Sequence, residues 1–161
     1  MIFFLDSSSL VKLYHDEAGA DAMRELFRSP EHKGAFFVSD LVALEVLVRL
    51  AKRGRLGGRK ERRMFRHTVQ THVRHRAESL NVVGVEASVA RHAESIAVVN
   101  YDSGAGTLDL LHVASAAQLQ HRLPDQPLTF VVADRKLRSL AERLAFRTFD
   151  PERGDPATLD R

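Results

Sequence analysis

The chain of 161 residues contains no cysteine. This absence excludes a disulfide framework and any metal site built on thiolates, and it is compatible with a reducing compartment. The apolar beginning of the sequence is only a few residues long and carries no basic segment before it. Such a beginning is too short for a membrane span and lacks the pattern of a signal peptide. We therefore expect a cytoplasmic protein that does not associate with membranes.

Acidic residues are nearly absent from residues 49–76, where Glu61 is the single carboxylate among many cations. Solvated helical faces usually mix both signs, so this imbalance favours nucleic acid or another acidic partner over a plain solvated face. The net charge of the whole chain is only +3, so the positive charge is concentrated in this segment. The candidate contacts to a polyanion are Arg59, Lys60, Arg62 and Arg63.

With 44% hydrophobic residues, the chain is long enough to bury the core of one domain. Short apolar stretches bounded by polar residues predict strands, and apolar residues three and four apart predict helices between them. This alternation implies one α/β domain with a mostly parallel central sheet and helices on both faces. We expect the domain to span residues 1–151 and a polar tail to span residues 152–161. The expected strands lie near residues 1–5, 35–38, 80–85, 128–133 and 147–149.

Two aspartates directly follow two of the expected strands. Asp6 follows the apolar run that ends at Leu5, and Asp134 follows the run that ends at Ala133. In open α/β sheets, ligands bind outside the carboxyl edge of the strands, so both side chains lie where a cation or phosphate would be met. N-capping of the next helix is the alternative interpretation for Asp6, and it does not exclude a second role.

Two further carboxylates lie in predicted helices. Glu45 belongs to the segment Leu41–Val48, which is apolar on nearly every face, so its carboxylate is expected to be partly buried. A buried carboxylate without a partner is costly or becomes protonated, so Glu45 needs a cation, which is either a metal ion or Arg49 one turn later. Asp109 lies in the first turn of a helix that begins at Thr107, where a favourable interaction with the helix dipole is the alternative role.

The histidines are less informative than the carboxylates. His112 follows Asp109 at i+3 on the same helical face, and we expect it to have a hydrogen-bonded packing role, because hard divalent ions favour oxygen ligands. His67, His72 and His75 have strongly cationic surroundings and no acidic ligand beside them. We expect these three side chains at the surface.

The four carboxylates could converge on one pocket at the carboxyl edge of the sheet. Gathered carboxylates repel one another unless a cation binds, and Mg²⁺ and Mn²⁺ prefer oxygen ligands. These ions polarise phosphodiesters and lower the pKa of bound water. An acidic pocket together with a basic segment therefore predicts a metal-dependent nuclease. The candidate catalytic residues and metal ligands are Asp6, Glu45, Asp109 and Asp134.

Four motifs of this chain, in their order, resemble those of PIN domains. They are Leu5–Tyr14, Leu44–Val46, Leu108–Ala116 and Ala133–Leu137. The resemblance spans residues 1–151 and is greatest to the VapC-type toxins of toxin–antitoxin pairs, which are small single-domain Mg²⁺-dependent ribonucleases. One departure is Val132, where many relatives carry a hydroxyl group two residues before the last aspartate.

The resemblance implies a PIN-like domain that cleaves RNA. It also implies a small antitoxin protein as cognate partner, whose tail covers the active site, and a homodimer. The metal ligands that it implies are Asp6, Glu45, Asp109 and Asp134.

Two other functions stay open. A housekeeping RNA-processing PIN nuclease is the alternative within the nuclease class, and a small upstream partner gene would separate it from a toxin. A non-catalytic RNA-binding module is the alternative from another class, and it would explain residues 49–76 but leave Glu45 without a reason. A phosphoaspartyl phosphatase does not fit, because Ser8 stands where a second aspartate would be needed.

Overall fold

The computed structural model describes residues 1–159. Its centre is a five-stranded sheet in the order β3-β2-β1-β4-β5, in which every neighbouring pair is parallel. The expected strands and their parallel arrangement are confirmed. The strands are β1 (Ile2–Leu5), β2 (Phe36–Ser39), β3 (Asn81–Val83), β4 (Leu128–Val131) and β5 (Arg147–Phe149).

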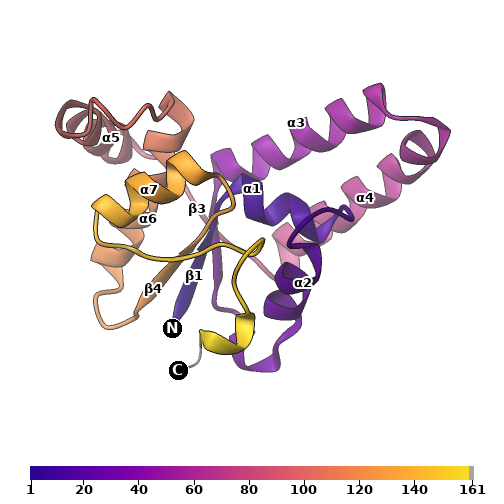
Figure 1. The fold of residues 1–161 in the computed structure, drawn as a ribbon, viewed down its shortest axis with the longest axis horizontal. Helices are drawn as coiled ribbons and strands as arrows, with labels where there is room; N and C mark the ends of the chain where they lie inside the picture. The colour runs from indigo at the N-terminus through magenta and orange to yellow at the C-terminus, as the bar shows by residue number, and fades with distance from the viewer. Residues whose placement is uncertain (160–161) are drawn as a thin grey trace.

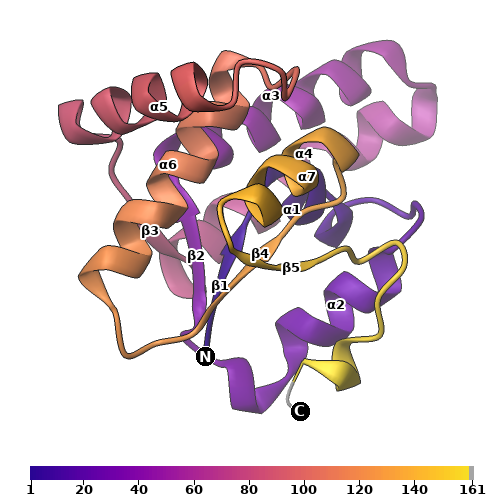
Figure 2. The same ribbon diagram turned by 60° about the vertical axis from the view of Figure 1, so that its left-hand side comes forward.

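Helices cover both faces of the sheet, as expected (Figures 1 and 2). Several begin at side chains that satisfy free backbone N–H groups: the Ser39 hydroxyl accepts the N–H of Val42 at the start of α3, for example. Short 3₁₀ turns are η1 (Val11–Leu13), η2 (Pro30–His32) and η3 (Pro156–Thr158). The helices are α1 (Ser7–Leu10), α2 (Ala20–Arg28), α3 (Asp40–Leu56), α4 (Arg59–Glu78), α5 (Ala87–Val99), α6 (Thr107–Arg122) and α7 (Arg135–Arg143).

Strand β1 is buried on both faces because its side chains alternate between two cores. Phe3 and Leu5 pack with residues of α1, α2 and α3. Ile2 and Phe4 pack with residues of α5, α6 and α7. A strand buried on both faces has a continuous apolar sequence, which is why the run Ile2–Leu5 predicts a central strand. No helix within residues 1–159 is long and apolar enough to cross a membrane.

The strand order places a switch point between β1 and β4. The chain runs from β1 outward through β2 to β3, and then crosses to the other side of β1 to form β4 and β5. Ligands of open parallel sheets bind at such a point, outside the carboxyl ends of the strands. The residues that follow β1 and β4 are Asp6 and the segment that leads to Asp134.

Helices α3 and α4 form a hairpin whose tip extends away from the sheet (Figure 1). Its anchor is His72, whose side chain is fully buried. The His72 ring lies 3.1 Å from the Tyr14 hydroxyl through Nδ1 and 3.2 Å from the Ala43 carbonyl oxygen through Nε2. The expectation of a surface position is therefore wrong for His72. Its side chain lies on the face of α4 that packs on the domain, where Tyr14 and Ala43 supply its hydrogen-bond partners.

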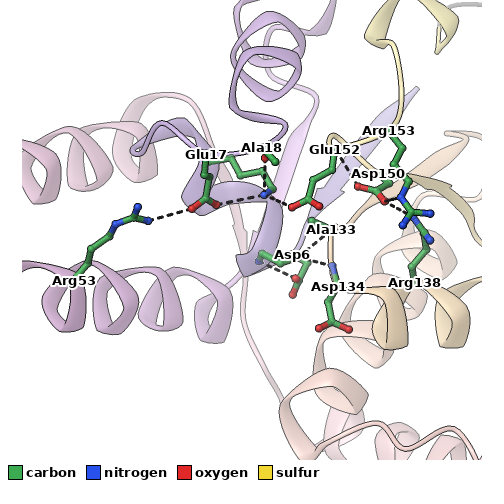
Figure 3. A network of polar contacts seen from close by, with 12 residues as sticks. Asp6, Glu17, Ala18, Arg53, Ala133, Asp134, Arg138, Asp150, Glu152 and Arg153 are labelled. Atoms are coloured by element: carbon green, nitrogen blue, oxygen red, sulfur yellow. Dashed lines mark hydrogen bonds and ion pairs between the residues drawn. The ribbon is translucent and has the colours of Figure 1, made fainter. Parts of the chain in front are cut away.

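The segment after β5 returns to α2 and η1. The buried Lys12 ammonium group binds Glu152 at 2.7 Å and Glu17 at 3.3 Å, and Glu17 also pairs with Arg53 of α3 (Figure 3). Leu159 is only 3% exposed and belongs to the core that contains α2. A Cβ atom on Gly19 would lie 2.6 Å from the carbonyl oxygen of residue 151, so only glycine permits this approach.

Candidate metal centre

Asp6 is a buried carboxylate directly after β1. Its backbone N–H donates to the Val131 carbonyl at 3.0 Å, and its Oδ2 accepts the N–H of Ser8 at 2.8 Å, which caps α1. The residue is 3% exposed. Burial raises the pKa of Asp6, although nearby His112 and hydrogen bonds from Ser8 act in the opposite direction. Because burial disfavours the charged form of Asp6, a bound cation would stabilise its carboxylate.

Glu45 projects from α3 toward the same place and meets α6. Its Oε2 lies 2.7 Å from Nε2 of His112, and the same nitrogen lies 3.8 Å from Oδ1 of Asp6. Burial on its own would raise the pKa of Glu45, but hydrogen bonds from His112 and Ser7 outweigh it and lower the pKa. The hydrogen-bond donors to Glu45 are thus His112 and Ser7 from other helices; Arg49 also lowers its pKa, but no ion pair joins the two side chains within residues 1–159.

The ligand atoms of Asp6, Glu45 and His112 all lie within 4.8 Å of one another. Within residues 1–159 this is the only such group of three or more potential metal-ligating side chains. Two carboxylate oxygens suit Mg²⁺ or Mn²⁺, and burial, which raises the pKa of Asp6, disfavours its charged form unless a cation binds. The residues present therefore fit a divalent cation held by Asp6 and Glu45.

Asp109 and Asp134 are not members of this group of ligand atoms. Asp109 lies one turn before His112 on α6, and its Oδ2 accepts the N–H of Gly106 at 2.8 Å. Asp134 caps α7, since its Oδ1 accepts the N–H groups of residues 136 and 137 at 2.8 and 3.0 Å. The N-cap considered for Asp6 is present, and Asp109 and Asp134 also each use one carboxylate oxygen to accept backbone N–H groups at a helix start.

Figure 3 shows Asp6 beside Ala133 and Asp134. Ser8 is hydrogen-bonded to all three residues. Its N–H donates to Asp6, while its hydroxyl oxygen accepts the N–H groups of Ala133 and Asp134 at 3.0 and 3.2 Å. Val132 points away from this junction into the apolar core and is fully buried. The loop after β4 is therefore held by a hydroxyl group that comes from α1.

The basic residues do not lie in the acidic cluster. Arg59, Lys60, Arg62 and Arg63 are exposed in the first turns of α4, at the tip of the hairpin. Beyond Glu45, α3 continues to Leu56, which is roughly 16 Å of helix at about 1.5 Å per residue. The acidic cluster and the four basic residues are thus separated by most of the length of α3.

Comparison with known proteins gives the family. Residues 3–143 match the PIN domain family. The fold is that of an α/β domain with an acidic cluster at the carboxyl edge of a parallel sheet. This chain belongs to the PIN domain family.

Solved structures share this fold at low sequence identity. FitAcB from Neisseria gonorrhoeae matches with 14% identity and a TM-score of 0.66, over 95% of this chain and 100% of that chain. VapC20 from Mycobacterium tuberculosis, described as a sarcin-ricin loop cleaving toxin, matches with 18% identity and a TM-score of 0.61, over 85% and 93%. VapBC2 from Rickettsia felis, solved with a DNA fragment from its promoter, matches with 14% identity and a TM-score of 0.64, over 93% and 98%. None of the curated proteins matches this chain.

Proposed function

We propose that this protein is a Mg²⁺- or Mn²⁺-dependent endoribonuclease and the toxin of a toxin–antitoxin pair. The proposal rests on the buried Asp6 carboxylate beside Glu45, at the switch point of a PIN fold. A divalent ion there would polarise a phosphodiester bond and supply a water molecule of lowered pKa for its hydrolysis. Asp6 and Glu45 would hold the ion, and we propose that Asp109 and Asp134 complete the set of carboxylates.

The carboxylates also explain why the site needs a basic segment elsewhere. RNA is a polyanion and would be repelled by an acidic cluster alone. We propose that Arg59, Lys60, Arg62 and Arg63 hold phosphates that flank the cleaved bond. Their distance along α3 from Glu45 suits an RNA strand that runs from the hairpin tip toward the sheet edge.

The direct test is RNA cleavage by the purified protein and by Asp6→Asn. Asparagine keeps an oxygen for the N–H of Ser8 but removes the charge, so we expect a folded protein with cleavage reduced by at least about 100-fold. Asp125→Asn, in an exposed loop, is the matched control and should cleave like wild type. Undiminished cleavage by Asp6→Asn would contradict the proposal, and RNA binding without any cleavage by wild type would favour a non-catalytic RNA-binding module.

A ribonuclease that acts on the RNA of its own cell needs a partner that blocks it. We propose a small antitoxin whose segment folds on binding and places an arginine against Asp6, Glu45 or Asp109, where a guanidinium group would compete with the metal. One structural relative, from Klebsiella pneumoniae, is described as a toxin–antitoxin complex, which supports such a partner. Expression of wild type alone should be toxic and co-expression with an adjacent small gene harmless, whereas a housekeeping RNA-processing nuclease would show no such dependence.

We also propose that the protein is a cytoplasmic homodimer. Large apolar side chains at the end of α5 and in the following turn are exposed, with Val98 at 76%, Val99 at 77% and Tyr101 at 88%. Contiguous exposed apolar surface often marks a protein interface. Val99→Glu should convert a dimer to a monomer in light scattering, whereas Val73→Glu on α4 should not.

A further inference from the structure

The His112 ring has two nitrogen atoms in very different surroundings. Its Nε2 lies 2.7 Å from the Glu45 carboxylate, which is a hydrogen-bond distance for a charged acceptor. Its Nδ1 is buried and has no hydrogen-bond partner within residues 1–159, and the whole residue is 1% exposed. This difference allows two roles of the imidazole to be compared, metal ligand and hydrogen-bond donor to Glu45.

As a metal ligand, Nε2 would direct its lone pair to the ion, so the hydrogen would be on Nδ1. Metal-ligating histidines almost always donate that second N–H to an acceptor, which is missing here. A buried N–H without an acceptor is destabilising. The tautomer with hydrogen on Nε2 instead donates to Glu45 and leaves no N–H without a partner.

We propose that His112 is a positioning residue, which holds the Glu45 carboxylate by its Nε2–H and does not bind the metal. This inference rests on the proposed metal site. Asp6 is fixed by burial and by the N–H of Ser8, but Glu45 has a longer side chain that enters from the separate helix α3. His112 supplies a donor at 2.7 Å from its carboxylate, beside the hydrogen bond from Ser7. The metal then meets oxygen ligands, which favours Mg²⁺ or Mn²⁺ over ions that prefer imidazole.

The first measurement needs no metal. In a long-range ¹H–¹⁵N spectrum of the metal-free full chain, the His112 signals are assigned by their loss in His112→Gln. We expect a hydrogen on Nε2, the atom that faces Glu45. A ring with hydrogen on Nδ1 alone would overturn the inference.

The second measurement is Mn²⁺ binding by calorimetry with two substitutions. Glutamine can place an amide N–H near the position of Nε2, whereas leucine cannot donate at all. We expect a dissociation constant within about 3-fold of wild type for His112→Gln and one raised about 10–100-fold for His112→Leu. His121→Leu, at an exposed position of the same helix, is the control and should match wild type. Equal losses in His112→Gln and His112→Leu would overturn the positioning role.

Pulsed electron paramagnetic resonance of bound Mn²⁺ distinguishes the two proposals and stays informative if His112→Leu fails to fold. We expect no coupling from a coordinated imidazole ¹⁴N in wild type. Such a coupling, lost in His112→Gln, would overturn the positioning role while leaving the metal site intact. Failure of wild type to bind Mn²⁺ at all would instead overturn the metal site, and the positioning role with it.

Discussion

The hydroxyl oxygen of Ser8 accepts the backbone N–H of Asp134 at 3.2 Å, across 126 residues of sequence. It also accepts the N–H of Ala133 at 3.0 Å. The backbone N–H of Ser8 meanwhile donates to Asp6. One serine thus fixes the relative positions of two strand ends that carry aspartates.

Ser8→Ala should destabilise the protein by about 1 kcal/mol, because the partly buried N–H of Ala133 and the exposed N–H of Asp134 lose their acceptor. Urea unfolding at pH 7.5 measures this change. Ser95→Ala is the control, since its exposed hydroxyl only donates to a carbonyl oxygen of its own helix, and it should change stability by less than about 0.5 kcal/mol. Equal stability of both variants would show that the Ser8 junction contributes nothing.

Asp6→Asn should leave the metal-free protein as stable as wild type or more stable. The folded-state pKa of Asp6 is raised, so its stabilising contribution exists at low pH and is lost as pH rises through that pKa. At pH 7.5 the buried charge is therefore a cost, which asparagine removes. Thermal unfolding in a chelator measures the effect, and for this size each 1 kcal/mol corresponds to about 2–4 °C. A clear drop in the melting temperature would show that the Asp6 charge is already compensated without metal.

The Tyr14–His72 contact makes stability depend on pH. Burial lowers the pKa of His72, with Arg76 and His75 acting in the same direction and a hydrogen bond to Ala43 opposing them. The ring donates Nε2–H to the Ala43 carbonyl, and its Nδ1 lies 3.1 Å from the Tyr14 hydroxyl, which also lies 3.3 Å from Nδ1 of His75. Protonation places a buried positive charge on the His72 ring, near Arg76 and His75.

In the unfolded chain His72 binds a proton near pH 6.5, whereas in the folded chain its pKa is lower. Stability should therefore fall as pH decreases from about 7 to 5. Unfolding free energies at pH 7.5 and 5.5 test this for wild type, His72→Gln and His67→Gln. The exposed His67 is the control and should keep the full pH dependence, whereas His72→Gln should reduce it. The same slope in all three proteins would assign the dependence to other groups.

Replacement of Arg59, Lys60, Arg62 and Arg63 by glutamine should weaken RNA binding and flatten its salt dependence. Each phosphate contact contributes roughly 0.7 to the slope of log affinity against log salt for a single strand. The control replaces four exposed cations outside the hairpin, Arg28, Lys33, Arg91 and Arg122. Binding of a short single-stranded RNA between 50 and 200 mM salt is measured by fluorescence anisotropy. A slope equal to that of wild type for the α4 variant would place the RNA elsewhere.

The strands of the sheet and the position of Asp6 at a strand end could be predicted from the sequence. Continuous apolar runs such as Ile2–Leu5 identify buried parallel strands, and residues after such strands are placed by topology. His112 was expected to be hydrogen-bonded, and it is. Its partner Glu45 could not be derived, because the meeting of α3 and α6 depends on how two helices pack on the sheet.

The burial of His72 was missed for a related reason. Its neighbours Val73 and Arg74 are exposed, and the cationic sequence of α4 suggests a solvated helix. The face of α4 that meets the domain is narrow and uses polar residues, with Thr68 and His72 its buried members. Apolar periodicity, the signal that locates other buried faces, is therefore too weak here to find it.

The central claim is metal-dependent RNA cleavage at the Asp6–Glu45 site, and a metal titration of cleavage by chelator-stripped protein tests it most directly. We predict that stripped wild type is inactive, that Mn²⁺ or Mg²⁺ restores cleavage in a saturable way, and that Asp6→Asn is not restored by either ion at any concentration up to about 10 mM. Cleavage by stripped wild type, or full restoration of Asp6→Asn, would contradict the account.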